Sequence, residues 1–250
     1  MEQTKEDLAI AAVMLAGKLM IENGADMARV DDALYRIARN AGISDPKIFE
    51  TTTGIMMSIP SLHNAQVQPI QRRFGIDLEK IARVNDASRA FQAQKITLAE
   101  LYSRLQAIDE KVPFFAFRWQ VLGAALVSST LQVLYGGSWF DFLPTFVIGA
   151  VGYAVYYWVN IKLKLKFVSE FLGSVVLAFM ALLAVKYHLG INADMIVIGA
   201  IMPLVPGVPL TNAVRDILAG HILSGIARAT EAFLSACAIS MGVGIILRFW

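Results

Sequence analysis

The second half of the chain contains more long apolar stretches than a soluble domain of this size can bury. Residues 119–250 hold only 7 Lys+Arg and 5 Asp+Glu, whereas residues 1–118 hold 15 of each. A helix needs about 20 mainly apolar residues to cross a bilayer. Five stretches meet or approach this length: Trp119–Tyr135, Phe142–Ile161, Phe167–Val185, Met195–Leu210 and Ser224–Leu247. The sequence therefore predicts an all-α membrane bundle with about five transmembrane helices.

Lysines between the second and third stretches indicate the orientation of this bundle. Lys162, Lys164 and Lys166 lie there, whereas the preceding connection, Gly136–Asp141, has no basic residue. Because cytoplasmic connections carry an excess of Lys and Arg, we expect the lysine connection to face the cytoplasm. The N-terminus lacks the pattern of a signal peptide, since Lys18 interrupts its first apolar run. Both observations predict a cytoplasmic N-terminus.

The first 115 residues have the pattern of a small α+β domain. Apolar residues recur at helical spacing in the first 41 residues, with Asp26 as a plausible N-cap of the second helix. Thr97 and Glu100 form a capping-box pattern before the last helix. The expected elements are helices over 8–19 and 27–41, strands over 48–61 and 66–76, and helices over 77–92 and 98–108. We therefore expect a cytoplasmic domain over 1–115 and a transmembrane domain over 116–250.

Several classes of function find no support in the residues. His63 has no second histidine or cysteine at metal-ligand spacing and is interpreted as a turn residue. Cys237 is the only cysteine, which excludes intrachain disulfides and cysteine-built metal sites. No nucleophile elbow or phosphate-binding loop appears, and the first half has no basic cluster that suggests nucleic-acid binding. We expect no enzyme activity, no cofactor, no metal and no nucleic-acid partner.

The fourth apolar stretch is interrupted by Pro203, Pro206 and Pro209, with Gly207 between the last two. Each proline lacks an N–H and clashes with the carbonyl four residues back, so Gly199, Met202 and Val205 would lose their helical donors. Transporters use broken helices of this kind to bind substrates near the membrane midplane. The alternative is a kink whose carbonyls are satisfied by neighbouring helices. We predict a site at the break.

Polar residues beyond the break complete the candidate site. Asn212 is a plausible cap of a new helix, whose N–H groups would suit a carboxylate. Charged residues inside membrane spans are functional candidates because they are expensive to bury. Arg228 and Glu231 are three residues apart, so a structural ion pair between them is the simpler alternative. The candidates for substrate binding are Pro203, Pro206, Gly207, Asn212, Arg215 and Arg228, and those for proton coupling are Glu170, Asp216 and Glu231.

The residues from Leu204 to Arg228 resemble the signature of the threonine/serine exporter family. That signature has a V-P-G break, an N-A pair, an aspartate, a G-H or G-D pair and a G-x-x-R that opens the last helix. Here these are Val205–Gly207, Asn212–Ala213, Asp216, Gly220–His221 and Gly225–Arg228. The turn Gly24–Asp26 with Arg29 and Val30 is similar to part of the family's cytoplasmic domain.

At 250 residues the chain is similar to the large subunit of the split, two-component form of this family, as in the enterobacterial succinate exporter. The resemblance implies a bacterial inner-membrane protein that exports a small carboxylated metabolite (threonine, serine or succinate). It also implies a hetero-oligomer with a small integral membrane subunit. The alternative is a membrane-anchored ligand sensor or scaffold, although a simple anchor needs no triple-proline break. An intramembrane enzyme is disfavoured because the spans lack a catalytic motif.

Overall fold

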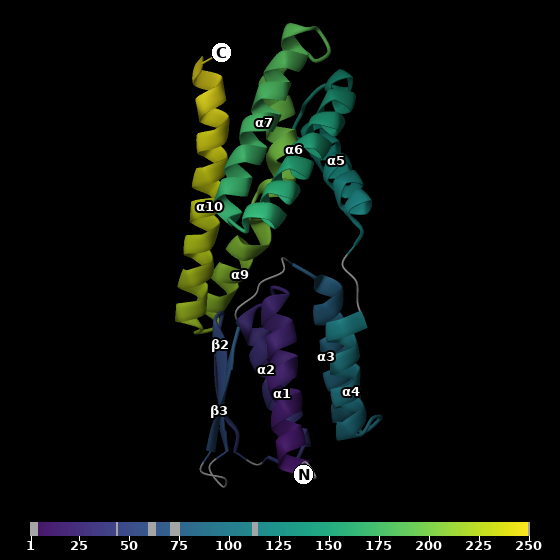
Figure 1. Cartoon of the computed structure of the whole chain (residues 1–250), viewed down its shortest axis with the longest axis vertical. Coiled ribbons are helices and arrows are strands. Elements are labelled where there is room, and N and C mark those ends of the chain that lie inside the picture. The colour runs from purple at the N-terminus through teal and green to yellow at the C-terminus, as the bar shows by residue number, and fades with distance from the viewer. Residues whose placement is uncertain (1–4, 44, 60–63, 71–75, 112–114, 250) are drawn as a thin grey trace. The chain divides into compact units, whose positions relative to one another are not determined.

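A computed structural model describes residues 5–43, 45–59, 64–70, 76–111 and 115–249. His63 and residues 71–75 of the second expected strand lie outside these ranges. The chain forms two compact units (Figure 1). The first comprises residues 1–114 and 208–229, and the second comprises residues 115–207 and 230–250.

The first unit contains four N-terminal helices, a three-stranded sheet and the segment 208–229. Its elements are α1 (Lys5–Glu22), α2 (Met27–Asn40), β1 (Lys47–Thr51), β2 (Gly54–Ile59), β3 (Asn64–Pro69), α3 (Leu78–Gln92), α4 (Leu98–Lys111), most of α9 (Gly207–Leu218) and the start of α10 (Ile222–Phe249). Helix α1 packs against α2, α3, α4 and the sheet, and most of its residues are buried. The core of this unit is therefore built around α1.

Capping residues explain where three of these helices begin. Asp26 caps α2 by accepting the N–H of Arg29 at 3.1 Å, and Asp77 caps α3 by accepting two N–H groups. Thr97 and Glu100 form the reciprocal capping box of α4. These three predicted helix starts are confirmed.

The predicted strand over 48–61 is wrong because it is a hairpin. Strands β1 and β2 are antiparallel, with Thr51 paired to Gly54 and only Thr52 and Thr53 between them. Strand β2 also pairs antiparallel with β3, which ends at Pro69. Proline at the end of an edge strand removes no bond from the ladder, so the second expected strand is confirmed as far as Pro69.

The second unit is a helical bundle. Its elements are α5 (Phe117–Leu134), the 3₁₀ helix η2 (Trp139–Asp141), α6 (Phe142–Leu163), α7 (Lys166–Lys186), α8 (Ala193–Ile201), the 3₁₀ helix η3 (Met202–Leu204) and the remainder of α10. Helices α5 to α8 pack against one another, and the end of α10 contributes Ile239 to the same buried cluster.

Small residues allow the close helix contacts that the sequence indicates. A Cβ on Gly152 would lie 3.1 Å from a side-chain atom of Leu177, and one on Gly242 would lie 2.7 Å from the carbonyl oxygen of Phe171. Gly173 faces Gly152 in the same way. These glycines let α6, α7 and α10 pack with their backbones close together, as in other membrane bundles.

Three of the helices that the structure describes are long and apolar enough to cross a membrane, namely residues 139–163, 166–186 and 222–249. A fourth is counted if residues 193–204 and 207–218 together make one broken span. The first expected span corresponds to α5, which is not among them. The structure therefore supports a helical membrane protein with three or four such helices, and a fifth stays a prediction.

Replacing Leu34 by Ala should lower the free energy of unfolding of the first unit by about 2–5 kcal/mol, since its side chain is fully buried in the core. Leu78 is 63% exposed, so Leu78→Ala is the matched control and should change stability by less than about 1 kcal/mol. Chemical denaturation of the purified full chain measures both. Equal effects would contradict this assignment of the core.

Candidate functional site

The turn between α1 and α2 presents its backbone to the signature residues of the second half. Gly24 has φ of 87°, a left-handed conformation that glycine adopts without strain, and this turns the chain sharply after α1. As a result, the carbonyl groups of Gly24 and Ala25 and the N–H of Met27 are not used by regular helix hydrogen bonds. Each of them bonds to a side chain of α9 or α10.

Three residues of α9 meet this turn from one face of the helix. Asn212, Arg215 and Asp216 are spaced three and four residues apart, which places them on the same side. The amide of Asn212 donates to the carbonyl oxygen of Gly24 at 2.9 Å. Arg215 Nη1 lies 3.0 Å from Asp26 Oδ2. The α9 face is therefore polar where it meets the turn.

Asp216 and Arg228 form the buried centre of this arrangement. Asp216 is fully buried, and Arg228 is 6% exposed. Asp216 Oδ1 accepts the N–H of Met27 at 2.7 Å, and its Oδ2 lies 3.1 Å from Arg228 Nε. Arg228 Nη2 donates to the carbonyl oxygen of Ala25 at 2.6 Å. We call residues 24–27 together with Asn212, Arg215, Asp216 and Arg228 the clasp.

The charges of the clasp are balanced. Asp26 and Asp216 face Arg215 and Arg228, so the two buried acids are neutralised by two guanidinium groups. Asp216 also lies at the N-terminus of α2, where the helix dipole favours a negative charge. Buried charges are tolerated when they are paired and hydrogen-bonded in this way. The clasp is thus a closed electrostatic network.

A second polar cluster lies in the helical bundle. Glu231 on α10 accepts a hydrogen bond from Lys166 on α7 at 2.8 Å. One turn further along α7, Glu170 is 3% exposed and accepts the hydroxyl of Ser235 at 3.0 Å. Its other carboxylate oxygen has no hydrogen-bond partner among the residues that the structure describes. The two carboxylates therefore differ, because one is paired with a cation and the other only with a hydroxyl.

The expected stripe of unpaired carbonyls at the proline break is not present. The oxygens of Gly199, Met202 and Val205 accept the N–H groups of Met202, Val205 and Gly207, respectively. The chain achieves this by tightening into the 3₁₀ helix η3 and a further turn, instead of continuing as an α-helix. The prediction that these carbonyls are open to a ligand is wrong.

The prolines occupy positions where no N–H is needed. Pro203 lies in the first turn of η3, Pro206 directly precedes α9, and Pro209 lies in the first turn of α9. The helix after the break begins at Gly207 and not at Asn212. The prediction that Asn212 caps this helix is therefore wrong, and its side chain bonds to Gly24 instead.

The structure separates the candidate residues into groups. Asn212, Arg215, Asp216 and Arg228 come together in the clasp, whereas Glu170 and Glu231 lie in the second unit. The sequence analysis considered an ion pair between Arg228 and Glu231. In the structure Arg228 pairs with Asp216, and Glu231 pairs with Lys166. Pro203, Pro206 and Gly207 shape the break.

The sequence reasoning missed Asp141. Its carboxylate is fully buried and accepts the N–H groups of Ile191 and Asn192 at 2.6 and 3.3 Å. It thereby ties the start of α6 to the connection between α7 and α8. A single acid between Phe140 and Phe142 was the available signal, because an acid among aromatic residues needs a specific partner.

Glu50 and His221 were also missed. Glu50 on β1 is buried, and its Oε1 lies 3.5 Å from Nδ1 of His221 in the α9–α10 turn. Burial, followed by the nearby charge of Asp31, raises the pKa of Glu50 to about 7. The signal was a glutamate directly after the apolar residues Ile48 and Phe49, at an inward-facing position of the strand.

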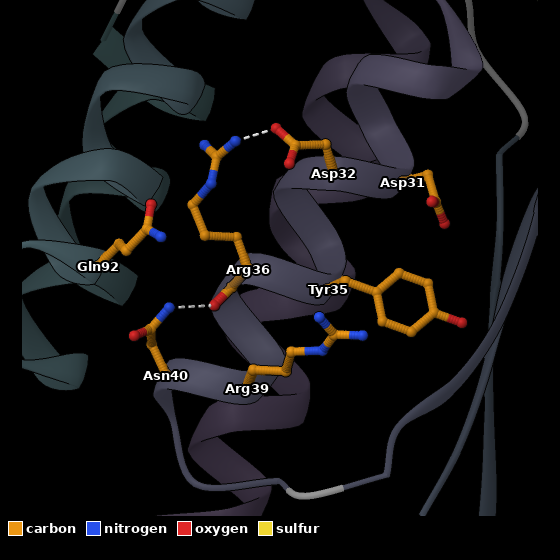
Figure 2. Close-up of a pocket in the computed structure, with 7 residues that line it drawn as sticks. All are labelled: Asp31, Asp32, Tyr35, Arg36, Arg39, Asn40 and Gln92. Carbon is orange, nitrogen blue, oxygen red and sulfur yellow. Dashed lines mark hydrogen bonds and ion pairs between the residues drawn. The ribbon is translucent and has the colours of Figure 1, made fainter.

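A polar pocket of about 680 Å³ lies on the first unit beside α2 (Figure 2). Its lining consists of Asp31, Asp32, Tyr35, Arg36, Arg39, Asn40 and Gln92. Arg36 pairs with Asp32 and donates to Ser88 Oγ at 2.9 Å, so its charge is already used within the protein. The pocket shares no residue with the clasp.

The chain was compared with families and proteins already described. A family model described as "Putative threonine/serine exporter" matches residues 11–250. The chain is 25% identical to the "Probable succinate transporter subunit YjjP" of Escherichia coli (strain K12), over 99% of this chain and 97% of that protein. It is 23% identical to the protein of the same name in Klebsiella aerogenes, over 92% of this chain and 90% of that protein. No solved structure matches.

Asp216→Asn and Arg228→Gln should each lower the free energy of unfolding by about 3–5 kcal/mol, because each leaves a buried charge without its partner. The double variant should lose less than the sum of the two, since neither charge then remains. Chemical denaturation of the four proteins gives the coupling energy. Arg83→Gln is the control, because its 54% exposed side chain pairs with Glu79 on α3, outside the clasp, and additive effects would contradict the pairing.

Proposed function

Because this chain belongs to the threonine/serine exporter family, we propose that it is one subunit of a secondary transporter that exports small carboxylated metabolites. The family match covers nearly the whole chain, and two relatives of similar length are named as subunits of a succinate transporter. Threonine, serine and succinate differ in charge but share a carboxylate. The relatives' description as subunits supports a separate membrane partner, and we propose that this partner is a small integral membrane protein.

The arrangement of charges supports a location in the bacterial inner membrane with the N-terminal unit in the cytoplasm. Lys162, Lys164 and Lys166 lie where α6 meets α7, and such basic clusters mark the cytoplasmic side. The ion pair between Lys166 and Glu231 places the first third of α10 beside this lysine-rich connection. The start of α10 then lies on the cytoplasmic side, which agrees with its place in the N-terminal unit.

We propose that the clasp is the cytoplasmic gate of this transporter. The carboxylate of Asp216 is bound by a helix N-terminus and a guanidinium group, which are the partners that a substrate carboxylate would seek. A substrate that reaches Arg228 competes with Asp216 for it and thereby opens the clasp. This buried Arg228–Asp216 pair on the backbone of residues 25–27 is the observation on which the proposal rests.

The break at Pro203, Pro206 and Gly207 supports such a movement. Non-helical backbone between η3 and α9 provides few hydrogen bonds that resist a change of direction. Transporters commonly place binding residues next to discontinuous helices. In this proposal Asn212 and Arg215 hold α9 to the turn in the closed state, and they become available to substrate once the clasp opens.

Glu170 is the proposed carrier of the coupling proton. It is buried in α7, where an ionisable group is expensive to keep, and it accepts a hydrogen bond from the hydroxyl of Ser235. Glu231 is already paired with Lys166, so we assign the proton to Glu170 and not to Glu231. Glu170 would exchange a proton as the bundle alternates between its two orientations.

The gate is tested by efflux of labelled threonine, serine and succinate from proteoliposomes that contain this chain with or without its partner. Arg228→Gln should reduce efflux at least tenfold, because the substrate carboxylate loses its guanidinium. Pro206→Ala should also reduce efflux, because it allows a helical bond across the break. Arg83→Gln is the matched control and should leave efflux unchanged, since this exposed side chain pairs with Glu79 on α3, outside the clasp. Full efflux in Arg228→Gln would contradict the gate, and no efflux with either assembly would contradict export.

Coupling is tested separately from binding. Glu170→Gln should abolish efflux driven by a proton gradient but retain exchange of labelled for unlabelled substrate, since exchange needs no net proton movement. Both assays use the same proteoliposomes, with Glu231→Gln in parallel. If Glu170→Gln retained gradient-driven efflux, the coupling proton would have to be carried elsewhere.

A further inference from the structure

Three titratable side chains meet in the first unit although they come from distant parts of the chain. Glu50 lies on β1, Asp31 on α2 and His221 in the turn between α9 and α10. The carboxylate of Glu50 lies 3.5 Å from the imidazole of His221, and their side chains are 5% and 23% exposed. Neither the proposed gate nor the coupling step uses these residues.

The strand pattern places Glu50 where an apolar residue is expected. Phe49 on β1 is 56% exposed, whereas Glu50 is buried and pairs with the fully buried Ile55 of β2. Side chains alternate between the two faces of a strand, so the carboxylate of Glu50 is on the core side. A buried carboxylate is costly unless it is paired or protonated. This position is therefore chemically unusual for a purely structural residue.

Burial and a neighbouring negative charge both favour the protonated form of Glu50. Burial first, and the negative charge of Asp31 second, raise the pKa of Glu50 to about 7. Burial also raises the pKa of Asp31, whereas His221 and Arg39 act to lower it. Figure 2 shows Asp31 and Tyr35 projecting from the same side of α2, away from Arg36. Glu50 thus lies buried within the influence of a second carboxylate.

The imidazole is connected to the clasp through the backbone. The N–H of His221 donates to the carbonyl oxygen of Asp216 at 2.8 Å, and the N–H of Gly225 donates to the oxygen of His221 at 2.9 Å. These bonds form the turn that joins α9 to α10. A change at His221 is therefore transmitted to the two helices that carry Asp216 and Arg228.

We propose that Glu50, Asp31 and His221 form a proton-binding site whose occupancy favours the closed α9–α10 turn. With the proton bound, Glu50 is neutral and fits beside the imidazole of His221 and the carboxylate of Asp31. When the proton leaves, an ionised carboxylate lies buried within the influence of the Asp31 charge, and opening of the turn that carries His221 lets water reach it. The charged groups around this site are Arg39 on α2 and Asp216 on α9. The proposal rests on the proposed function only in that opening the turn also loosens the gate.

The sign of the pH effect follows from the pKa of Glu50. An opened turn exposes Glu50 to water, where its pKa is near the ordinary value of 4.5, so the closed state binds the proton more tightly. Opening is therefore least favourable at low pH. Between pH 4.5 and 7 the equilibrium constant for opening should rise about tenfold per pH unit for one proton, and the rise should level off above pH 7.

Hydrogen–deuterium exchange of the full chain in lipid nanodiscs tests this without any transport. The probes are the amides of residues 216–225, with rates corrected for the intrinsic effect of pH on exchange. Glu50→Gln should remove the Glu50-linked rise of about tenfold per pH unit. Asp31→Asn should move the upper end of this rise to lower pH, because it removes the charge that helps to raise the pKa of Glu50.

Glu79→Gln is the matched control, since Glu79 is exposed and pairs with Arg83 on α3. It should leave the pH dependence unchanged. A rise in Glu50→Gln equal to that of the unmodified chain would overturn the proposal. If Glu50→Gln did not fold, Asp31→Asn would decide alone, and an unshifted pH dependence there would overturn it. Failure of efflux in proteoliposomes would leave these outcomes untouched and would count only against the gate.

Discussion

Arg228 and Asp216 form an ion pair that is almost completely removed from water, and the turn after α1 takes its shape around it. The guanidinium bonds to the carbonyl oxygen of Ala25, and the carboxylate bonds to the N–H of Met27, so the pair also satisfies backbone groups of the turn. Removing either side chain would leave both a charge and a backbone group without a partner. The segment 208–229 is for this reason part of the N-terminal unit, although it lies far along the chain.

Local signals predicted much of the fold. The caps at Asp26 and Asp77 and the capping box of α4 are short-range interactions, and such interactions can be recognised from a few neighbouring residues. The hairpin between β1 and β2 was missed because Thr52 and Thr53 are not typical turn residues, which left an apparently continuous β-rich run. Hydropathy predicted the membrane helices α6, α7 and α10, where composition alone is informative.

The candidate site was harder to predict because its contacts span nearly 200 positions of the chain. Asn212, Asp216 and Arg228 were selected as candidates, but they bond to backbone atoms of residues 24–27, and neither sequence motif indicates that the two segments meet. The proline break illustrates the opposite case. Its carbonyls were expected to be open because an α-helix was assumed, whereas a 3₁₀ turn offers each of them a nearer donor.

The length of α10 has a further consequence for the charge that it carries. Its 28 residues extend about 42 Å at 1.5 Å per residue, whereas the hydrocarbon core of a bilayer is about 30 Å thick. The overhang of about 12 Å corresponds to about eight residues. The residues of α10 that belong to the N-terminal unit, 222–229, are about this number. In the proposed orientation, an overhang of this size on the cytoplasmic side would put Arg228 level with the lipid head groups, so the helix would carry a buried arginine without drawing that charge into hydrocarbon.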